Sequence, residues 1–269
     1  MSKILVTGAT GHLGKAVVNI LADKVSPADI AVLVRDPAKA GDMQEKGVEI
    51  RQGDYDDYTS LVSAFEGSEK LYFVSGSDIM RRSKQHENVV NAAVEAGVRH
   101  VVYTSFQRKN ETGDSPITLI VNVHIKTEQM LRESGLVYTI LKHAVYADGL
   151  PTLLGNVLET GVIYQPAGDG RASYTLRSDM AEAGAVILTT PGHENKTYEI
   201  SVNTSYSYYD IAEILTSVTG KTIRYASPTP EEFRTTMLNA GVPKEYIGVM
   251  VGFSEAIRQG EFDIPDPTL

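Results

Sequence analysis

The sequence predicts an α/β fold in which a doubly wound parallel sheet carries a second, smaller α/β lobe. Short apolar runs rich in Val and Ile alternate with longer amphipathic segments through the first half of the chain. This pattern is typical of parallel strands that are buried on both faces and joined by crossover helices. A glycine-rich loop at residues 7–14 stands between the first run and the first helix. Together these observations predict a Rossmann-type sheet.

Six apolar runs are expected to form the sheet, and five segments between them have helical periodicity. The expected strands are Ile4–Thr7, Ile30–Val34, Val48–Arg51, Leu71–Ser75, Val101–Thr104 and Val137–Leu141. The expected helices are Leu13–Lys24, Ala38–Lys46, Tyr58–Glu66, Ser83–Ala96 and His124–Ser134. Four of these helices end at or next to a glycine, which is the residue that best closes a helix in left-handed geometry.

The regular alternation ends after the sixth run. We expect a helix after Ser178, a strand at Thr197–Val202 that returns to the sheet, and then a less regular region. That region comprises Tyr206–Thr219, a short strand near Thr222–Tyr225, helices after Pro230 and Pro243, and an extended tail at Glu261–Leu269. These segments are too few for a second sheet, and they predict a small lobe over the carboxyl edge of the strands.

Composition excludes several classes of protein. The 269 residues include 25 Lys and Arg against 34 Asp and Glu, a net charge of −9, and nucleic-acid binding needs a basic surface. The chain has no cysteine and its six histidines are scattered, which predicts no metal site. No apolar stretch approaches the ~18 residues of a membrane span, and no leader precedes Lys3. We expect a cytoplasmic protein without a nucleic-acid or membrane partner.

The loop Thr7-Gly-Ala-Thr-Gly-His-Leu-Gly14 has the context of a dinucleotide-binding loop. Gly8 would permit the tight turn, Gly11 the approach of a pyrophosphate, and Gly14 close packing of the helix on the sheet. The free N–H groups at the helix start would bind the phosphates, and Thr10, His12 and Leu13 belong to the same surface. The alternative is a glycine-rich turn without a ligand.

The end of the second expected strand indicates which nicotinamide cofactor is bound. An NAD site has a carboxylate about 20 residues past the loop, whereas Arg35 stands there in this chain. Arg35 is expected to bind the 2′-phosphate of NADPH, with Lys39 as a second cation. Asp36 is either a displaced ribose ligand or, as its neighbour Pro37 favours, the N-cap of the next helix.

Further cofactor contacts are expected where the next strands end. Asp54 and Tyr55 follow the third strand at the expected adenine edge. The small residues Ser75, Gly76 and Ser77 follow the fourth strand and are expected near the pyrophosphate and nicotinamide ribose. Thr104, at the end of the fifth strand, is expected to contact the cofactor as well. Each of these residues is also compatible with an ordinary turn.

Several motifs resemble the NmrA-like branch of the short-chain dehydrogenase/reductase superfamily over most of the chain. They include Val-Thr-Gly-Ala-Thr-Gly-His-Leu-Gly, Val-Arg-Asp-Pro-Ala-Lys-Ala, Val-Arg-His-Val-Val-Tyr-Thr-Ser and Val-His-Ile-Lys-Thr-Glu. Within that branch the chain is similar to members that reduce quinones and triphenylmethane dyes with NADPH. The resemblance implies a nucleotide-binding domain, at residues 1–147 and 177–202, and a substrate lobe at 148–176 and 203–269, whose last part is expected to be short.

The superfamily's catalytic Tyr-x-x-x-Lys pair is missing. The literal match, Tyr138 and Lys142, lies in an expected strand, which spreads the two residues over ~13 Å. Aligning Thr127 and Glu128 with relatives places His124 at the Lys position and Ile120 at the Tyr position; another register pairs Asn122 with Lys126. His124 would donate a proton, bind the cofactor ribose or serve only the fold.

A flat acceptor suits a site without this pair, because hydride transfer to an electron-poor ring needs little acid catalysis. Phe106 and Tyr146 follow the fifth and sixth strands, Tyr164 and Tyr174 lie toward the small lobe, and these four aromatics are expected to contact the acceptor. We assign catalysis to His124 and Tyr146. We expect Lys142 and His143 to orient the loop beneath the nicotinamide, with His143 in the cofactor site. The predicted function is NADPH-dependent reduction of a quinone or dye by a monomer or homodimer. The alternatives are a dinucleotide-binding regulator and, less favoured, a nucleotide-sugar epimerase.

Overall fold

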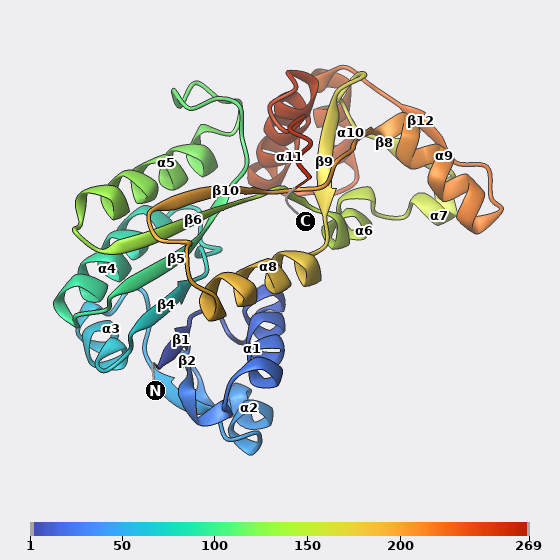
Figure 1. Cartoon of the computed structure of the whole chain (residues 1–269). Helices are drawn as coiled ribbons and strands as arrows, with labels where there is room; N and C mark the ends of the chain where they lie inside the picture. Colours follow the sequence, from blue (N-terminus) through green and yellow to red (C-terminus); the bar gives the residue numbers. More distant parts are fainter. Residues whose placement is uncertain (1–2, 268–269) are drawn as a thin grey trace.

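The computed structural model describes residues 3–267 and is built around a seven-stranded sheet, whose arrangement is shown in Figure 1. Its order is β10-β6-β5-β4-β1-β2-β3, and every pairing is parallel. The strands are β1 (Ile4–Val6), β2 (Ile30–Val34), β3 (Glu49–Gln52), β4 (Lys70–Phe73), β5 (His100–Phe106), β6 (Val137–His143) and β10 (Lys196–Ile200). All six predicted strands and the returning strand are confirmed. The strand order reverses between β1 and β4, which is where α/β sheets of this kind bind ligands.

Helices cover both faces of this sheet (Figure 1). One face packs against α1 (His12–Lys24) and α8 (Arg177–Thr189), and the other packs against α3 (Tyr58–Phe65), α4 (Arg82–Glu95) and α5 (Thr118–Glu133). Successive strand residues serve opposite faces, so that Ile4 and Val6 join the first apolar cluster and Leu5 the second. Burial on both faces explains why the strands are continuous apolar runs.

Two expected helices differ from the structure in extent. The segment predicted as one helix at Ala38–Lys46 consists of a 3₁₀ turn, η2 (Pro37–Ala40), and a short α2 (Gly41–Glu45). The helix predicted to begin at His124 begins instead at Thr118. Its first turn is rich in β-branched residues, which have a low helix propensity, and tertiary packing of Val121 in the core overrides that preference.

The second half of the chain contains small sheets, which corrects the expectation that its strands were too few. One sheet has the order β11-β9-β7, from β7 (Val145–Tyr146), β9 (Arg171–Thr175) and β11 (Ser205–Ser207), and a parallel pair joins β8 (Val162–Tyr164) to β12 (Arg224–Ala226). The remaining elements are η1 (Pro27–Asp29), η3 (Ala147–Gly149), α6 (Leu150–Leu154), α7 (Val157–Thr160), α9 (Tyr208–Thr219), α10 (Pro230–Asn239) and α11 (Lys244–Arg258). The strands β9 and β11 are mostly polar, so they lack the apolar run that marks the strands of the large sheet.

The C-terminal segment runs back to the sheet region after α11. Phe262 is fully buried beside Phe106 and Phe253, with ring centroids 5.3 and 5.0 Å away. The end of the predicted tail, residues 268 and 269, lies outside the described residues. Within residues 3–267, no helix combines the length and apolar character that crossing a membrane requires. The division into two domains stays a prediction.

Candidate active site

A cleft of about 610 Å³ opens at the carboxyl edge of the sheet, at the strand-order reversal. Loops that follow β1, β2, β3 and β4 line it, together with Tyr146 and the start of α8. Twelve of the residues predicted from the sequence meet here: Gly8, Thr10, Gly11, His12, Leu13, Arg35, Asp54, Tyr55, Ser75, Gly76, Ser77 and Tyr146. The volume lies in the ordinary range for small-molecule and cofactor sites.

The glycine loop forms a cradle that side chains would fill. Gly8 has φ +61°, a conformation that other residues adopt at a cost. Gly11 caps α1 with ordinary extended backbone angles and faces the cleft. A Cβ at Gly14 would lie 2.3 Å from the Gly8 carbonyl oxygen, so the third glycine is required by the loop itself, and not by the sheet as predicted. The α1 N-terminus therefore presents free N–H groups to the cleft.

The cation at the end of β2 has no side-chain hydrogen bond or ion pair within residues 3–267, whereas its acidic neighbour is engaged. Arg35 is exposed and lines the cleft. The Asp36 carboxylate accepts a hydrogen bond from the Ala38 N–H at 3.1 Å, the predicted cap of η2. This bond favours the capping interpretation of Asp36 over the ribose-ligand interpretation. Lys39 lies in η2 and is not among the residues that line the cleft.

Tyr55 joins the ends of the two strands that flank the strand-order reversal. Its hydroxyl lies 2.5 Å from Thr7 Oγ1 and 2.8 Å from the Val74 carbonyl oxygen. Thr7 Oγ1 also accepts a hydrogen bond from the Val74 N–H at 2.9 Å. The ring was expected at the adenine edge; the structure adds that its buried hydroxyl holds β1 and β4 in register. Asp54 forms a local turn through the Asp56 N–H at 3.0 Å.

Two buried side chains, Thr104 and His86, position the loop after β4 through hydrogen bonds from its backbone N–H groups. Thr104 is buried, and its Oγ1 accepts a hydrogen bond from the Ser75 N–H at 2.9 Å, so Thr104 supports a cleft residue without lining the cleft. His86 Nε2 accepts the Gly76 N–H at 3.0 Å, which leaves Nδ1 to donate to Thr127 Oγ1 at 2.9 Å. Burial and the charge of Arg82 lower the pKa of His86 to about 3, so the neutral ring serves this loop at neutral pH.

His124 is held in a buried cluster of rings behind the cleft. Its Nδ1 lies 2.7 Å from the Tyr103 hydroxyl, and its ring centroid is 6.0 Å from that of Phe106. Burial, followed by the charge of Arg82, lowers the pKa of His124 well below its ordinary value. A neutral His124 can hydrogen-bond a ribose or carbonyl oxygen, but it is seldom protonated and so is a poor general acid. Ile120 lies one turn away on α5, at the position of the superfamily's catalytic Tyr, so α5 itself supplies no phenol there.

Four polar residues that sequence analysis missed also line the cleft: Asp78, Arg81, Gln85 and Arg177. Arg177 begins α8, pairs with Asp148 at 2.7 Å, and lies over the Tyr146 ring at 5.0 Å from its centroid. Gln85 donates to Asp56 at 3.1 Å, and Arg81 pairs with the same carboxylate at 2.7 Å. An isolated arginine at a helix start carries no sequence signal, because only the fold brings it beside Tyr146.

Some predicted contacts lie outside the cleft lining. His143 is buried with both ring nitrogens enclosed and without a hydrogen bond in the described chain, and burial lowers its pKa to about 3. Tyr174 is buried in β9. Tyr164 stacks on Phe233 at a centroid distance of 5.9 Å. The structure therefore does not bring Tyr164, Tyr174 or His143 to the cleft lining, and Phe106 lies behind it beside His124.

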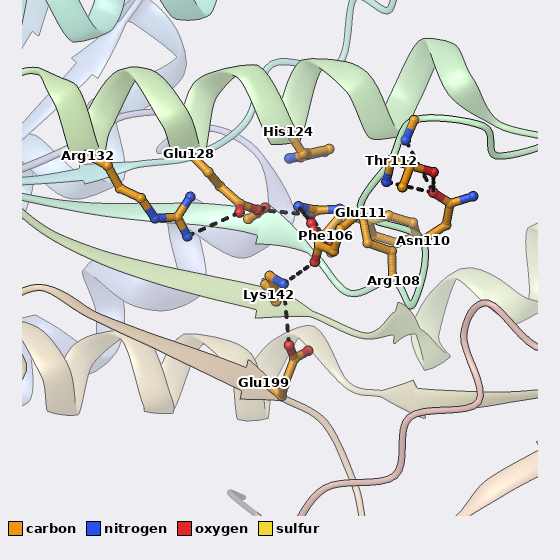
Figure 2. Close-up of polar contacts among 12 residues, drawn as sticks. Phe106, Arg108, Asn110, Glu111, Thr112, His124, Glu128, Arg132, Lys142 and Glu199 are labelled. Atoms are coloured by element: carbon orange, nitrogen blue, oxygen red, sulfur yellow. Dashed lines mark hydrogen bonds and ion pairs between the residues drawn. The ribbon is translucent and has the colours of Figure 1, made fainter.

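A network of ion pairs fixes the loop between β5 and α5 (Figure 2). Arg108 and Glu128 are both buried and pair at 2.9 Å, and Ser105 also donates to Glu128. Glu111 accepts from Arg108 at 2.6 Å and from Lys142 at 2.5 Å. Lys142 is thus an anchor for this loop, and its position on β6 confirms that Tyr138 and Lys142 are not a catalytic pair on a helix.

We expect Arg108→Met to lower the free energy of unfolding by roughly 3 kcal/mol, because it leaves Glu128 buried without its main partner. Arg132→Met is the matched control, since exposed Arg132 contacts the same carboxylate at 3.5 Å and should cost less than ~1 kcal/mol. The double variant Arg108→Met with Glu128→Gln should recover most of the loss. Urea unfolding measures all three, and equal losses for Arg108→Met and Arg132→Met would contradict this assignment.

The fold and the site define a class of protein. The model of the NmrA-like family matches residues 1–265, and the chain belongs to this family. Sequence resemblance to the NmrA-like branch is thereby confirmed.

Individual relatives are similar over most of their length. Quinone oxidoreductase 2 of Escherichia coli is 38% identical over 240 residues, covering 89% of this chain and 82% of the relative. Its NADPH complex has a TM-score of 0.90, covering 96% of this chain and 89% of that one at 36% identity. The Citrobacter triphenylmethane reductase complexed with NADP(H) has a TM-score of 0.89 at 38% identity, covering 98% and 93%. The NAD(P)H azoreductase of Xenophilus azovorans is 30% identical, covering 92% and 84%.

Proposed function

We propose that this protein is an NADPH-dependent reductase that delivers hydride to a flat, electron-poor aromatic acceptor such as a quinone or dye. The observation that carries the proposal is the cleft at the β1–β4 reversal, which both the glycine cradle and the exposed Arg35 line. Relatives that share this fold are named for reduction of quinones, azo compounds and triphenylmethane dyes.

The residues present fit NADPH. A Cβ at Gly11 would lie 3.2 Å from the Gly8 carbonyl oxygen. A larger side chain at Gly11 would therefore extend into the cleft, where the cofactor is expected. The α1 N-terminus would bind the pyrophosphate and Arg35 the 2′-phosphate. NADPH, when bound, supplies a hydride. Tyr146, with Arg177 over its ring, would form a wall against which a flat acceptor stacks.

His124 has a supporting role in this scheme. The neutral ring, oriented by the Tyr103 hydroxyl, would hydrogen-bond the cofactor ribose or the acceptor. A reduced quinone oxygen can take its proton from water, so the chemistry does not require a strong acid. Alcohol oxidation and sugar epimerisation, by contrast, need a base placed on a hydroxyl group.

The function is tested by NADPH oxidation across a panel of quinones, azo dyes and triarylmethane dyes. We expect turnover with at least one class. Tight NADPH binding without turnover of any acceptor would instead support a dinucleotide-binding regulator, and turnover of a nucleotide sugar would support an epimerase. The cytoplasmic location and the monomeric or homodimeric state stay predictions. Light scattering, which measures the molar mass in solution, tests the oligomeric state.

We expect Arg35→Ala to weaken NADPH binding about 10-fold and to leave NADH binding nearly unchanged. A charge-assisted hydrogen bond contributes roughly 1.5–3 kcal/mol, and exposure of Arg35 places the effect at the low end. Lys39→Ala should have a smaller effect. Calorimetry gives both dissociation constants, with Asp36→Ala as the comparison. Equal loss for both cofactors in Arg35→Ala, or a wild-type preference for NADH, would contradict the assignment.

A further inference from the structure

Arg177 brings hydrogen-bond donors without a partner to the cleft. It is the first residue of α8, it lines the cleft, and its side chain is 21% exposed. Its Nε donates to the Asp148 carboxylate at 2.7 Å, whereas within residues 3–267 neither Nη1 nor Nη2 forms a hydrogen bond. Asp148 is not among the residues that line the cleft. The ion pair therefore holds the guanidinium through Nε and leaves its terminal N–H groups available to a ligand.

Two other arginines line the cleft, and they are placed differently. Arg81 is paired twice, with Asp56 and with Asp78 at 2.7 Å each. Arg35 follows β2, where the 2′-phosphate of NADPH is expected. Arg177 therefore differs from both, since it has a single acidic partner and no expected phosphate ligand.

Arg177 lies at the side of the cleft where the flat acceptor is expected. Its guanidinium carbon is 5.0 Å from the centroid of the Tyr146 ring, within the range of a cation–π contact. Tyr146 follows β6, and β6 is three places from β1 in the sheet order, which corresponds to about 14 Å at the usual strand spacing. The Tyr146 hydroxyl also forms no hydrogen bond within residues 3–267. The proposed acceptor wall thus carries two groups with unused donors, apart from the glycine loop.

We propose that Arg177 binds an anionic substituent of the acceptor, a sulfonate or a carboxylate, through Nη1 and Nη2, and that it thereby favours anionic acceptors over neutral and cationic ones. This selectivity rests on the reductase function proposed above. The planar fork of arginine matches two oxygens of such a group. In the reaction a quinone gains a hydride from NADPH and a proton from water, which gives the hydroquinone and NADP⁺, and the anionic substituent is unchanged.

The charge of Arg177 acts differently on the three kinds of acceptor. An anionic substituent gains a charge-assisted hydrogen bond, a neutral quinone gains none, and a cationic triarylmethane dye is repelled. Asp148 offsets part of this charge, and salt screens a partly exposed group, so the selectivity should be largest at low ionic strength. A merely structural role for Arg177 would change all three activities by the same factor.

The acceptors for the test are 1,2-naphthoquinone-4-sulfonate and neutral 1,2-naphthoquinone, which differ by one sulfonate, and malachite green as the cationic dye. In Arg177→Gln we expect kcat/KM for the sulfonate to fall about 10-fold, mainly through KM, because a charge-assisted hydrogen bond is lost. Activity with the neutral quinone should stay within about 3-fold of wild type, and activity with the dye should stay or rise. The NADPH dissociation constant should not change. Arg177→Lys should recover part of the loss, since lysine keeps the charge without the planar fork.

Arg132→Gln is the matched control. Arg132 also pairs with a carboxylate, that of Glu128 at 3.5 Å, and lies over a tyrosine ring, that of Tyr138 at 6.0 Å, but it is not among the residues that line the cleft. The same chemical change there should leave the ratio of the two quinone activities as it is in wild type. An equal fall of this ratio in both variants would show that the net charge of the protein, and not Arg177, sets the preference.

The outcomes separate this inference from the proposed function. If wild type oxidises NADPH with none of the quinones and dyes, the reductase function and with it the role of Arg177 are wrong. If wild type is active and Arg177→Gln lowers the two quinone activities by the same factor, or weakens NADPH binding, the function stands and the inference on Arg177 is overturned.

Inhibition of wild type gives a measurement that needs no variant. The anion 2-naphthalenesulfonate should inhibit more strongly than the neutral 2-naphthalenesulfonamide, and it should compete with the acceptor. Equal inhibition by the two compounds would contradict the role of Arg177. Competition of the sulfonate with NADPH would place the anion in a phosphate site of the cofactor and would also overturn the inference.

Discussion

Gly11→Val is expected to weaken NADPH binding at least ~100-fold while the protein stays folded. The backbone at Gly11 has φ −87° and ψ 169°, which valine adopts readily. The added Cβ meets only the Gly8 carbonyl oxygen, at 3.2 Å, so a shift of a few tenths of an ångström in the loop accommodates it. The added side chain would stand in the cleft over the α1 N-terminus, where the pyrophosphate is expected. Loss of two charge-assisted hydrogen bonds of roughly 1.5 kcal/mol each corresponds to about two orders of magnitude in affinity.

Two other glycines supply the controls. Gly41→Val makes the same chemical change at a position where a Cβ meets nothing within 4 Å, and it should leave binding unchanged. Gly14→Ala would place a Cβ 2.3 Å from the Gly8 carbonyl oxygen and should lower the thermal midpoint instead. Calorimetry and circular dichroism distinguish these effects. Undiminished affinity in a well-folded Gly11→Val protein would show that the pyrophosphate does not lie on the loop.

Acid is expected to destabilise the fold through its buried histidines. The pKa values of His86 and His143 are about 3 in the folded state, against about 6.5 in an unfolded chain. Above pH 6.5 both histidines are neutral in the folded and the unfolded state, so they do not change the free energy of unfolding. As the pH falls below 6.5, these histidines bind protons in the unfolded state but not in the folded state. The free energy of unfolding therefore falls by about 1.4 kcal/mol per pH unit for each group.

At pH 5 the two histidines together should cost about 4 kcal/mol relative to pH 7, and His124, whose pKa is also lowered, adds to the loss. Burial raises the pKa values of Glu199 and Glu261, and these two carboxyls act in the opposite direction. Urea unfolding between pH 5 and 7 measures the net slope.

His143→Leu isolates one contribution, because neither ring nitrogen of His143 has a hydrogen bond to lose. The variant should be at least as stable as wild type at pH 7, and its stability should depend less steeply on pH by about one proton. A slope that does not change in this variant would show that His143 is not a neutral buried group.

Short-range patterns in the sequence predicted much of the fold. The predicted runs at Ile30–Val34 and Val137–Leu141 are apolar because both faces of the sheet are covered. This pattern can be recognised from the local sequence alone. The cap at Asp36 was predicted for the same reason, since its hydrogen bond closes within three residues. The strands β8 and β9 were missed, because each is stabilised by partners far along the chain.

The sequence by itself determined the parallel sheet, the glycine cradle, the cation after β2 and the lack of a catalytic Tyr-Lys pair, because each depends on residue type and local spacing. Only the tertiary structure decided which side chains meet across the chain. It placed Arg177 on the Tyr146 ring and put the His86 ring against the Gly76 N–H. It also showed that Tyr164 packs on Phe233, away from the cleft. Such contacts join segments distant in sequence, and no local period or turn preference encodes them.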